Sequence, residues 1–303
     1  MSRRLPRKPK YASVPTDYGI EVRSMTKALR GRLILDRVDL EVRRGTLAVL
    51  EGSNGAGKTT LIRSLATVVA PDSGTVLVNG YDVVRQSLDV RRSIGVSFAN
   101  ERSLYWRINA FENLELFGKI AGLAKPAIAE RSVDLLEQLR LMDVSRLQVA
   151  RLSTGQRQRL MVARAFLTDP AVVLLDEPFR GIDGEGLHSI IDLVSDRVGH
   201  GTTALIVAPL IDAIVPAADR MYRIQDGRIW PTGADRSAGG QGDHGNPGDQ
   251  GNPSDDGDDG NDGIPGAEGN PGAEGNPGDE GNPGAVEPEG RLPQTGGRVG
   301  EHP

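Results

Sequence analysis

Short apolar runs alternate along residues 19–230 with longer stretches in which apolar positions recur every three or four residues. Three runs are almost continuously apolar, as expected of parallel strands covered on both faces: residues 46–51, 171–175 and 203–207. Helical spacing is found in three stretches: residues 58–69, which Pro71 ends, 110–121 and 127–141. This alternation predicts an α/β fold with a mostly parallel sheet and a largely helical region between its first two strands.

The end of the chain has a different composition. From residue 231 onward there are three Arg and fifteen acidic residues, whereas the part before it has 33 basic and 26 acidic residues. In residues 242–286 every third position is glycine, interrupted at Ser254, which is a collagen-like pattern. The interruption and the density of like charge favour a disordered tail over residues 231–303 rather than a triple helix, which would require a trimer.

Composition narrows the class of protein further. The chain has no cysteine, which excludes disulfides and cysteine metal sites and fits a reducing cytoplasm. No apolar run reaches the ~18–20 residues that span a bilayer, and no apolar segment follows the basic N-terminus, so we expect no secretion signal. Residues 1–18 are interpreted as a flexible basic arm, with contact to anionic lipid headgroups as the alternative.

A glycine-rich turn between the first strand and the following helix carries the strongest motif. Its residues match G-x-x-x-x-G-K-[ST]: Gly52, Ser53, Asn54, Gly55, Ala56, Gly57, Lys58, Thr59 and Thr60. Glycines let backbone N–H groups approach phosphate oxygens, and the start of the helix adds partial positive charge. Lys58 is the expected counter-charge for the β- and γ-phosphates, and the Thr59 hydroxyl is an expected ligand of Mg²⁺. The motif predicts a nucleoside triphosphate site.

An acidic pair, Asp176 and Glu177, follows the second apolar strand. Asp176 would hold Mg²⁺ directly or through water, and Glu177 would polarise the attacking water as general base. The alternative is an ordinary acidic pair at a strand end. The presence of the phosphate motif favours the catalytic interpretation.

A third motif narrows the class of ATPase. Residues 152–159, Leu-Ser-Thr-Gly-Gln-Arg-Gln-Arg, resemble the LSGGQ signature of ABC ATPases, with Thr154 in place of one glycine. Three other segments are similar to that family in order and sequence, namely its hairpin at residues 71–80, its D-loop at 181–183 and its closing strands at 218–229. The resemblance identifies residues 19–230 as an ABC-type ATP-binding domain. It implies a P-loop NTPase, RecA-like core with an inserted helical lobe at about residues 100–168.

The resemblance also implies partners. In this family two subunits enclose two ATP molecules, so Ser153, Gly155 and Gln156 would contact the γ-phosphate held by the other subunit. The implied cofactors are ATP and Mg²⁺. The implied partners are a membrane-spanning transporter subunit and a second ABC ATPase, in a homodimer or a heterodimer, with no nucleic acid. The expected location is cytoplasmic, on the inner face of the cell membrane.

Three positions depart from the family's pattern. Leu29 stands where an aromatic residue stacks on adenine, a loss that weakens binding by ~1–3 kcal/mol. Ala99 stands in place of the Q-loop glutamine, with Asn100 or Glu101 as substitutes. Pro209 replaces a histidine that contacts the γ-phosphate, and loss of one such stabiliser costs ~10²–10³ in rate. We therefore predict slow hydrolysis by the isolated protein.

The segment after Ala99 is similar to an insertion found in a subgroup of ABC exporters. Its Tyr105 and Trp106 are either a docking surface for the membrane subunit or part of the packing of the lobe. The leading interpretation is a transport ATPase of an exporter. The alternatives are a catalytically degenerate, regulatory half of a heterodimer, indicated by Ala99 and Pro209, and a soluble ABC ATPase outside transport.

Overall fold

The computed structural model describes residues 14–99, 103–209 and 213–233. Its strands are β1 (Tyr18–Leu29), β2 (Arg32–Arg43), β3 (Leu47–Gly52), β4 (Ser73–Val78), β5 (Tyr81–Asp82), β6 (Ile94–Ser97), β7 (Val172–Asp176), β8 (Thr203–Val207), β9 (Arg220–Gln225) and β10 (Arg228–Thr232). Its helices are α1 (Lys58–Leu65), α2 (Ser87–Ser93), α3 (Ala110–Ile120), α4 (Lys125–Gln138), α5 (Thr154–Phe166) and α6 (Gly184–Gly199), with 3₁₀ helices η2 (Met142–Val144) and η3 (Val149–Arg151). Most of the basic arm and of the tail, together with Asn100 and Glu101, lies outside the described residues.

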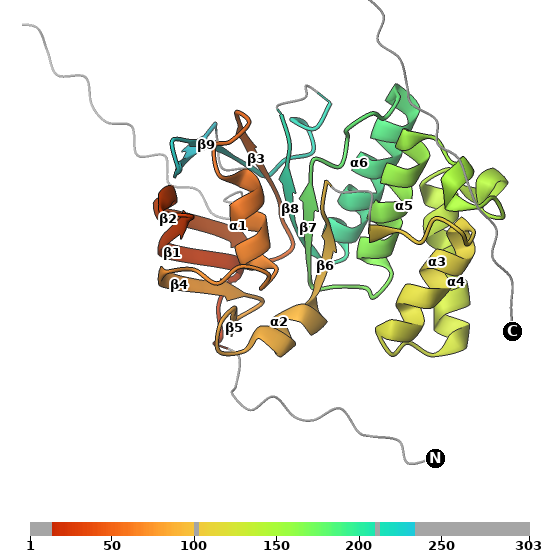
Figure 1. Cartoon of the computed structure of the whole chain (residues 1–303), viewed down its shortest axis with the longest axis horizontal. Helices are drawn as coiled ribbons and strands as arrows, with labels where there is room; N and C mark the ends of the chain where they lie inside the picture. Colours follow the sequence, from red (N-terminus) through yellow and green to blue (C-terminus); the bar gives the residue numbers. More distant parts are fainter. Residues whose placement is uncertain (1–13, 100–102, 210–212, 234–303) are drawn as a thin grey trace, which may run out of the picture. The chain divides into compact units, whose positions relative to one another are not determined.

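The larger sheet has six strands in the order β10-β9-β3-β8-β7-β6 (Figure 1). Strands β9, β3, β8, β7 and β6 are parallel, and β10 pairs with β9 in the antiparallel direction. Every residue of β7 and β8 is buried, which accounts for their continuous apolar runs. The predicted α/β fold with a mostly parallel sheet is confirmed. The outer strands are the four-residue β6 and β10, which contains Pro231.

A second sheet was not predicted from the sequence. It is antiparallel, with the order β2-β1-β4-β5. Strand β2 shows the alternation typical of such strands, because Val38, Leu40 and Val42 are buried while the residues between them are exposed. Strands β4 and β5 form the hairpin that the resemblance indicated at residues 71–80.

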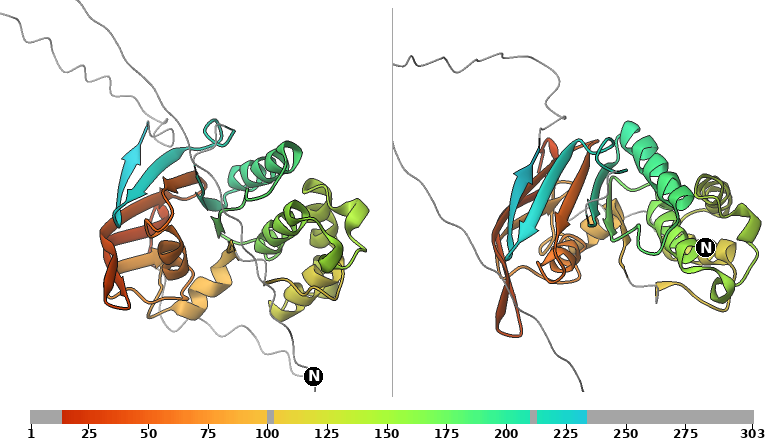
Figure 2. Two further views of the ribbon diagram at one scale, coloured as in Figure 1. Left: turned by 45° about the horizontal axis from the view of Figure 1, so that its top comes forward. Right: turned by 90° about the horizontal axis from the view of Figure 1, so that it is seen from above.

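Alternate residues of the parallel strands point into two separate cores. On β7, Val173 and Leu175 join the core that contains α3, α4, α5 and α6. Val172 and Leu174 join the core that contains α1 and the antiparallel sheet. Figures 1 and 2 show the same division, with the antiparallel sheet and α1 on one side of the parallel sheet and the helices from α3 to α6 on the other.

The helical region between β6 and β7 is confirmed, with small differences at the ends of helices. Helix α1 ends at Leu65 instead of residue 69. Thr67 adopts a positive φ of 63°, and the Val68 amide donates to the carbonyl of Arg63, five residues back. Thr67, Val68 and Val69 are β-branched, so they disfavour a further helical turn and the chain turns away before Pro71.

In the three described ranges, no helix has the length and apolar character needed to cross a bilayer.

Candidate nucleotide site

The predicted catalytic segments gather at one edge of the parallel sheet. Strands β3, β7 and β8 are parallel neighbours, so the segments that follow their carboxyl ends lie together. Backbone hydrogen bonds join these ends: the Glu177 amide donates to the Val207 carbonyl (2.7 Å), and the Ala208 amide donates to the Leu50 carbonyl (3.3 Å). The glycine-rich loop, the acidic pair and the segment with Pro209 therefore share one edge.

The glycine-rich loop turns tightly into α1. Gly57 caps the helix with a φ of 109°, and a Cβ atom here would lie 2.8 Å from Leu35 Cδ2, so both conformation and space require glycine. Lys58 is buried, and its ammonium donates to the carbonyls of Gly52 (2.6 Å) and Ser53 (2.9 Å). The two carbonyls satisfy the buried ammonium in the absence of a ligand, and an anionic ligand can compete with them for its hydrogen bonds.

A cavity of about 350 Å³ brings most of the predicted phosphate-binding residues together. Its lining consists of Arg32, Ile34, Asn54, Gly55, Gly57, Lys58, Thr59, Thr60 and Glu177. Gly52, Ser53 and Ala56 belong to the loop but not to this lining. Sequence reasoning missed Arg32 and Ile34, which lie two residues apart at the start of β2. Their i and i+2 spacing places them on one face of the strand, but that spacing alone does not connect the face with the glycine-rich loop.

Asp176 has the environment of a cation ligand. It is 1% exposed, and neither carboxylate oxygen makes a well-formed hydrogen bond within the described part of the chain. Burial raises the pKa of this carboxyl, while the Thr59 hydroxyl and the positive charges of Arg63 and Lys58 oppose the rise. A buried carboxylate without a partner is costly, and a hydroxyl with a carboxylate is a donor set that suits Mg²⁺. The residues present therefore fit the metal.

Glu177 lies at the junction of two cavities. It is half-buried with a positive φ of 49°, and its carbonyl accepts a hydrogen bond from Gln158 Nε2 (3.2 Å). It lines the phosphate cavity and also a neighbouring cavity of about 480 Å³. The lining of this second cavity consists of Asn54, Glu177, Phe179, Arg180, Ala208 and Pro209. Pro209 thus faces the site, and its side chain has no donor to offer there.

The other two departures have different positions. Leu29 is 38% exposed at the end of β1 and is not among the residues that line the phosphate cavity. Ala99 follows β6, at the same edge of the sheet as the acidic pair. The proposed substitutes for its missing amide lie outside the described residues, so that prediction stays untested.

The signature residues lie at the start of α5 and form a capping box. Ser153 Oγ accepts from the Gln156 amide (3.1 Å), and Gln156 Oε1 accepts from the Ser153 amide (2.9 Å). Gly155 lies against the loop after Glu177, where an added Cβ atom would be 3.1 Å from the Gly181 carbonyl oxygen. Neither cavity has one of these three residues in its described lining. Their predicted contact with a partner's nucleotide stays a prediction.

Tyr105 and Trp106 are both packed on the helical region and partly exposed. The Tyr105 ring lies 5.9 Å from that of Phe117, and the Arg157 guanidinium lies 5.1 Å from the centre of the Trp106 ring. The exposed fractions are 53% for Tyr105 and 42% for Trp106. Packing and surface exposure coexist here, so both predicted roles are compatible with these positions.

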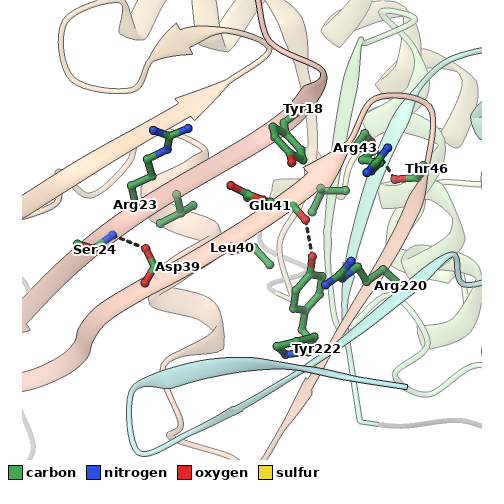
Figure 3. A pocket seen from close by; sticks show the side chains of 13 residues that line it. Tyr18, Arg23, Ser24, Asp39, Leu40, Glu41, Arg43, Thr46, Arg220 and Tyr222 are labelled. Atoms are coloured by element: carbon green, nitrogen blue, oxygen red, sulfur yellow. Dashed lines mark hydrogen bonds between the residues drawn. The ribbon is translucent and has the colours of Figure 1, made fainter. Parts of the chain in front are cut away.

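A larger cavity of about 560 Å³ lies elsewhere, between β1, β2 and β9 (Figure 3). The Tyr222 hydroxyl donates to the Glu41 carbonyl across it, and a hydrogen bond with the Glu41 side chain raises the pKa of Tyr18. Its described lining includes Thr46, just before β3, and no residue of the glycine-rich loop. It is therefore separate from the phosphate cavity.

Comparison with known proteins adds a second line of observation. The ABC transporter family model matches residues 35–180, and the collagen triple helix repeat model matches residues 227–291, of which the first few form β10. The daunorubicin resistance ATP-binding protein DrrA3 of Streptomyces coeruleorubidus is 38% identical over 213 residues, which cover 70% of this chain and 67% of the relative.

Two further matches cover a similar share of the chain. The Nod factor export ATP-binding protein I of Cupriavidus metallidurans is 35% identical over 211 residues, which cover 69% of each protein. The dimeric structure of the bacterial ABC transporter cassette MJ0796 superimposes with a TM-score of 0.64 at 24% identity, covering 69% of this chain and 96% of that one.

Proposed function

The chain belongs to the ABC transporter family, as an ATP-binding and ATP-hydrolysing subunit that powers transport through a separate membrane-spanning partner, and we propose that this transport is export. The fold predicted from the sequence, a P-loop NTPase core with an inserted helical lobe, is that of the family. The similarity to a Nod factor export ATP-binding protein supports this direction of transport. We take residues 19–230 as the ATP-binding domain and place it at the inner face of the membrane.

The observation that carries the catalytic assignment is one cavity lined by Lys58, Thr59 and Glu177, with Asp176 buried at the end of β7. Lys58 binds the β- and γ-phosphates once its ammonium leaves the loop carbonyls. Thr59 and Asp176 would hold Mg²⁺, which neutralises phosphate charge when bound. Glu177 orients the attacking water and accepts its proton.

We propose further that the site is completed by a second ABC ATPase. Ser153 and Thr154 are exposed at the start of α5, and neither Ser153 nor Gly155 belongs to the described lining of the two cavities at the nucleotide site. A helix N-terminus attracts anionic oxygen, so this end of α5 suits the γ-phosphate of a nucleotide bound to the partner. The dimeric arrangement of the similar cassette supports this proposal.

A heterodimer in which this chain is the slower half is the second candidate. It is favoured by Pro209, which faces the site without a donor, and by Ala99 at the end of β6. In that case a partner with a histidine at the equivalent position would form the faster site, using this chain's signature. The retained Glu177 favours activity of this chain's own site.

The test is ATP turnover by the full chain with Mg²⁺, beside Glu177→Gln, combined with size-exclusion chromatography in ATP. We expect measurable turnover by the wild type. In Glu177→Gln we expect at least a roughly 10²-fold loss and an ATP-dependent dimer. ATP binding without turnover or dimerisation of either protein would contradict the active-subunit proposal and favour the degenerate half.

A further inference from the structure

An arginine stands beside Pro209 at the edge of the site. Arg180 lies on the turn that begins at Glu177, and its amide donates to the Glu177 carbonyl (3.3 Å). The turn is held by Phe179, which is 9% exposed and packs in the core beneath α3 to α6. The backbone that carries Arg180 is therefore fixed relative to the general base.

The Arg180 side chain is exposed and has no ion pair with any residue in the described ranges. It lines the cavity of about 480 Å³ together with Pro209, Glu177 and Asn54. Asn54 and Glu177 also line the phosphate cavity, so the two spaces adjoin at these residues. A guanidinium with unused donors is thus placed within the same pair of cavities as the phosphate-binding loop.

The two described residues that follow β8, Ala208 and Pro209, offer no such donor. Pro209 has no side-chain hydrogen-bonding group and no backbone N–H, and the Ala208 amide is used by the Leu50 carbonyl. The Lys58 ammonium approaches the phosphates from the loop side. Arg180 is therefore the cation in the described lining of the cavity on the Pro209 side, while Arg32 and Lys58 line the phosphate cavity.

We propose that Arg180 donates hydrogen bonds to the γ-phosphoryl oxygens of ATP and acts as a catalytic residue in the place that Pro209 leaves without a donor. In the step concerned, the water oxygen forms a bond to the γ-phosphorus while the bond from that phosphorus to the β–γ bridging oxygen breaks. ADP leaves with the electron pair of the broken bond, and the proton of the water passes to Glu177. A planar guanidinium stabilises the charge on the transferred group, as arginines do in other phosphoryl-transfer enzymes.

This proposal rests on the proposed catalytic site, and its test uses the full chain. We would measure kcat and the Kd for ATP of Arg180→Ala, Arg180→Lys and the double variant Arg180→Ala/Pro209→His. Arg85→Ala is the matched control, because it removes another exposed arginine, one that is not in the described lining of either cavity. Trapping of ADP with orthovanadate, which mimics the transferred phosphoryl group, gives a readout of the transition state apart from turnover.

We expect Arg180→Ala to lower kcat by roughly 10²-fold and to lose vanadate trapping, while the Kd for ATP stays within about threefold. Arg180→Lys should keep part of the activity, and the added histidine should restore turnover to Arg180→Ala. Turnover and trapping unchanged in Arg180→Ala would overturn this inference and leave the ATPase assignment intact. Equal weakening of ATP and ADP binding would overturn it in favour of a binding role. Absent turnover in the wild type would overturn both proposals.

Discussion

Strands β3, β8, β7 and β6 are parallel neighbours whose carboxyl ends lie side by side, yet these ends differ in chemistry. At or after the ends of β3 and β7 come Lys58, Thr59, Asp176 and Glu177, the residues that we propose bind and hydrolyse the nucleotide. After β8 and β6 come Pro209 and Ala99, which have no side-chain donor or acceptor. All four strands run parallel, so the contrast lies in the residues at their ends and not in the direction of the strands.

The difference shows which functions depend on one strand end and which can be supplied from elsewhere. Phosphate and metal binding depend on the positions of the loop and of the carboxylate. Backbone N–H groups and a buried acid have fixed places in the fold, so a residue on a neighbouring turn cannot substitute for them. A hydrogen-bond donor to the γ-phosphoryl oxygens can come from any nearby side chain that is long enough to reach them. In our proposal this donor is Arg180, on the turn that follows β7. Under this proposal, the absence of a histidine contact after β8 does not by itself mean that ATP hydrolysis is lost.

The largest effect is expected at the end of β3. Lys58→Ala removes the only cation contributed by the loop, so ATP binding should weaken by at least roughly 10²-fold, the scale of a buried charge-assisted contact, and hydrolysis should disappear. Titration with a fluorescent ATP analogue measures this. Lys125→Ala, which changes an exposed lysine at the start of α4, is the control and should bind normally. Normal binding by Lys58→Ala would remove the loop from the site.

A smaller effect, of opposite sign, is expected at the end of β7. Burial raises the pKa of Asp176, so the ionised group costs stability, and that cost is absent at acidic pH and grows as pH rises through the folded-state pKa. Asp176→Asn should therefore melt higher than the wild type at pH 7 without nucleotide or metal. The rise is roughly 2–4 °C for each kcal/mol relieved, and it should vanish below about pH 4.

The same variant should lose the stabilisation that ATP with Mg²⁺ gives the wild type, so the two melting temperatures exchange order when both are added. Thermal unfolding with and without Mg²⁺ measures the exchange. Asp143→Asn, at an exposed site on η2, should show neither change. A lower melting temperature for Asp176→Asn in the absence of metal would mean that the carboxylate has a structural partner.

The smallest effect is expected at the end of β8. If Pro209 contributes no chemistry, Pro209→Ala should change kcat by less than about twofold, since an apolar side chain replaces another. Steady-state turnover decides this directly. A large fall in kcat would show that the proline ring itself shapes the site, and the strand ends would then differ less in what they contribute to hydrolysis.

Much of the parallel sheet could be predicted because β7 and β8 are buried on both faces and are apolar throughout. The antiparallel sheet was missed, although Val38, Leu40 and Val42 alternate clearly. Its first strand, β1, contains register shifts between Val22 and Lys27 that break the alternation on which such a prediction depends.

The site was predictable wherever the residues that act are contiguous in sequence. The phosphate loop and the acidic pair are of this kind. Arg32, Ile34 and Arg180 line the cavities through tertiary proximity, and no spacing rule connects β2 or the turn after Glu177 with the loop after β3. The predicted contact of Ser153 and Gln156 with a partner depends on how two subunits associate. A local sequence motif in one chain does not contain that information.

The two outer strands of the six-stranded sheet affect how the protein associates with copies of itself. An exposed strand edge is a template for pairing with another chain and hence for aggregation. Here β6 is only four residues long, and β10 contains Pro231, which has no N–H to offer a further strand. Edge-to-edge growth of the sheet is thus disfavoured at both ends. If this chain pairs reversibly with a second ATPase, as we propose, these two strand ends protect it from pairing irreversibly through its sheet edges.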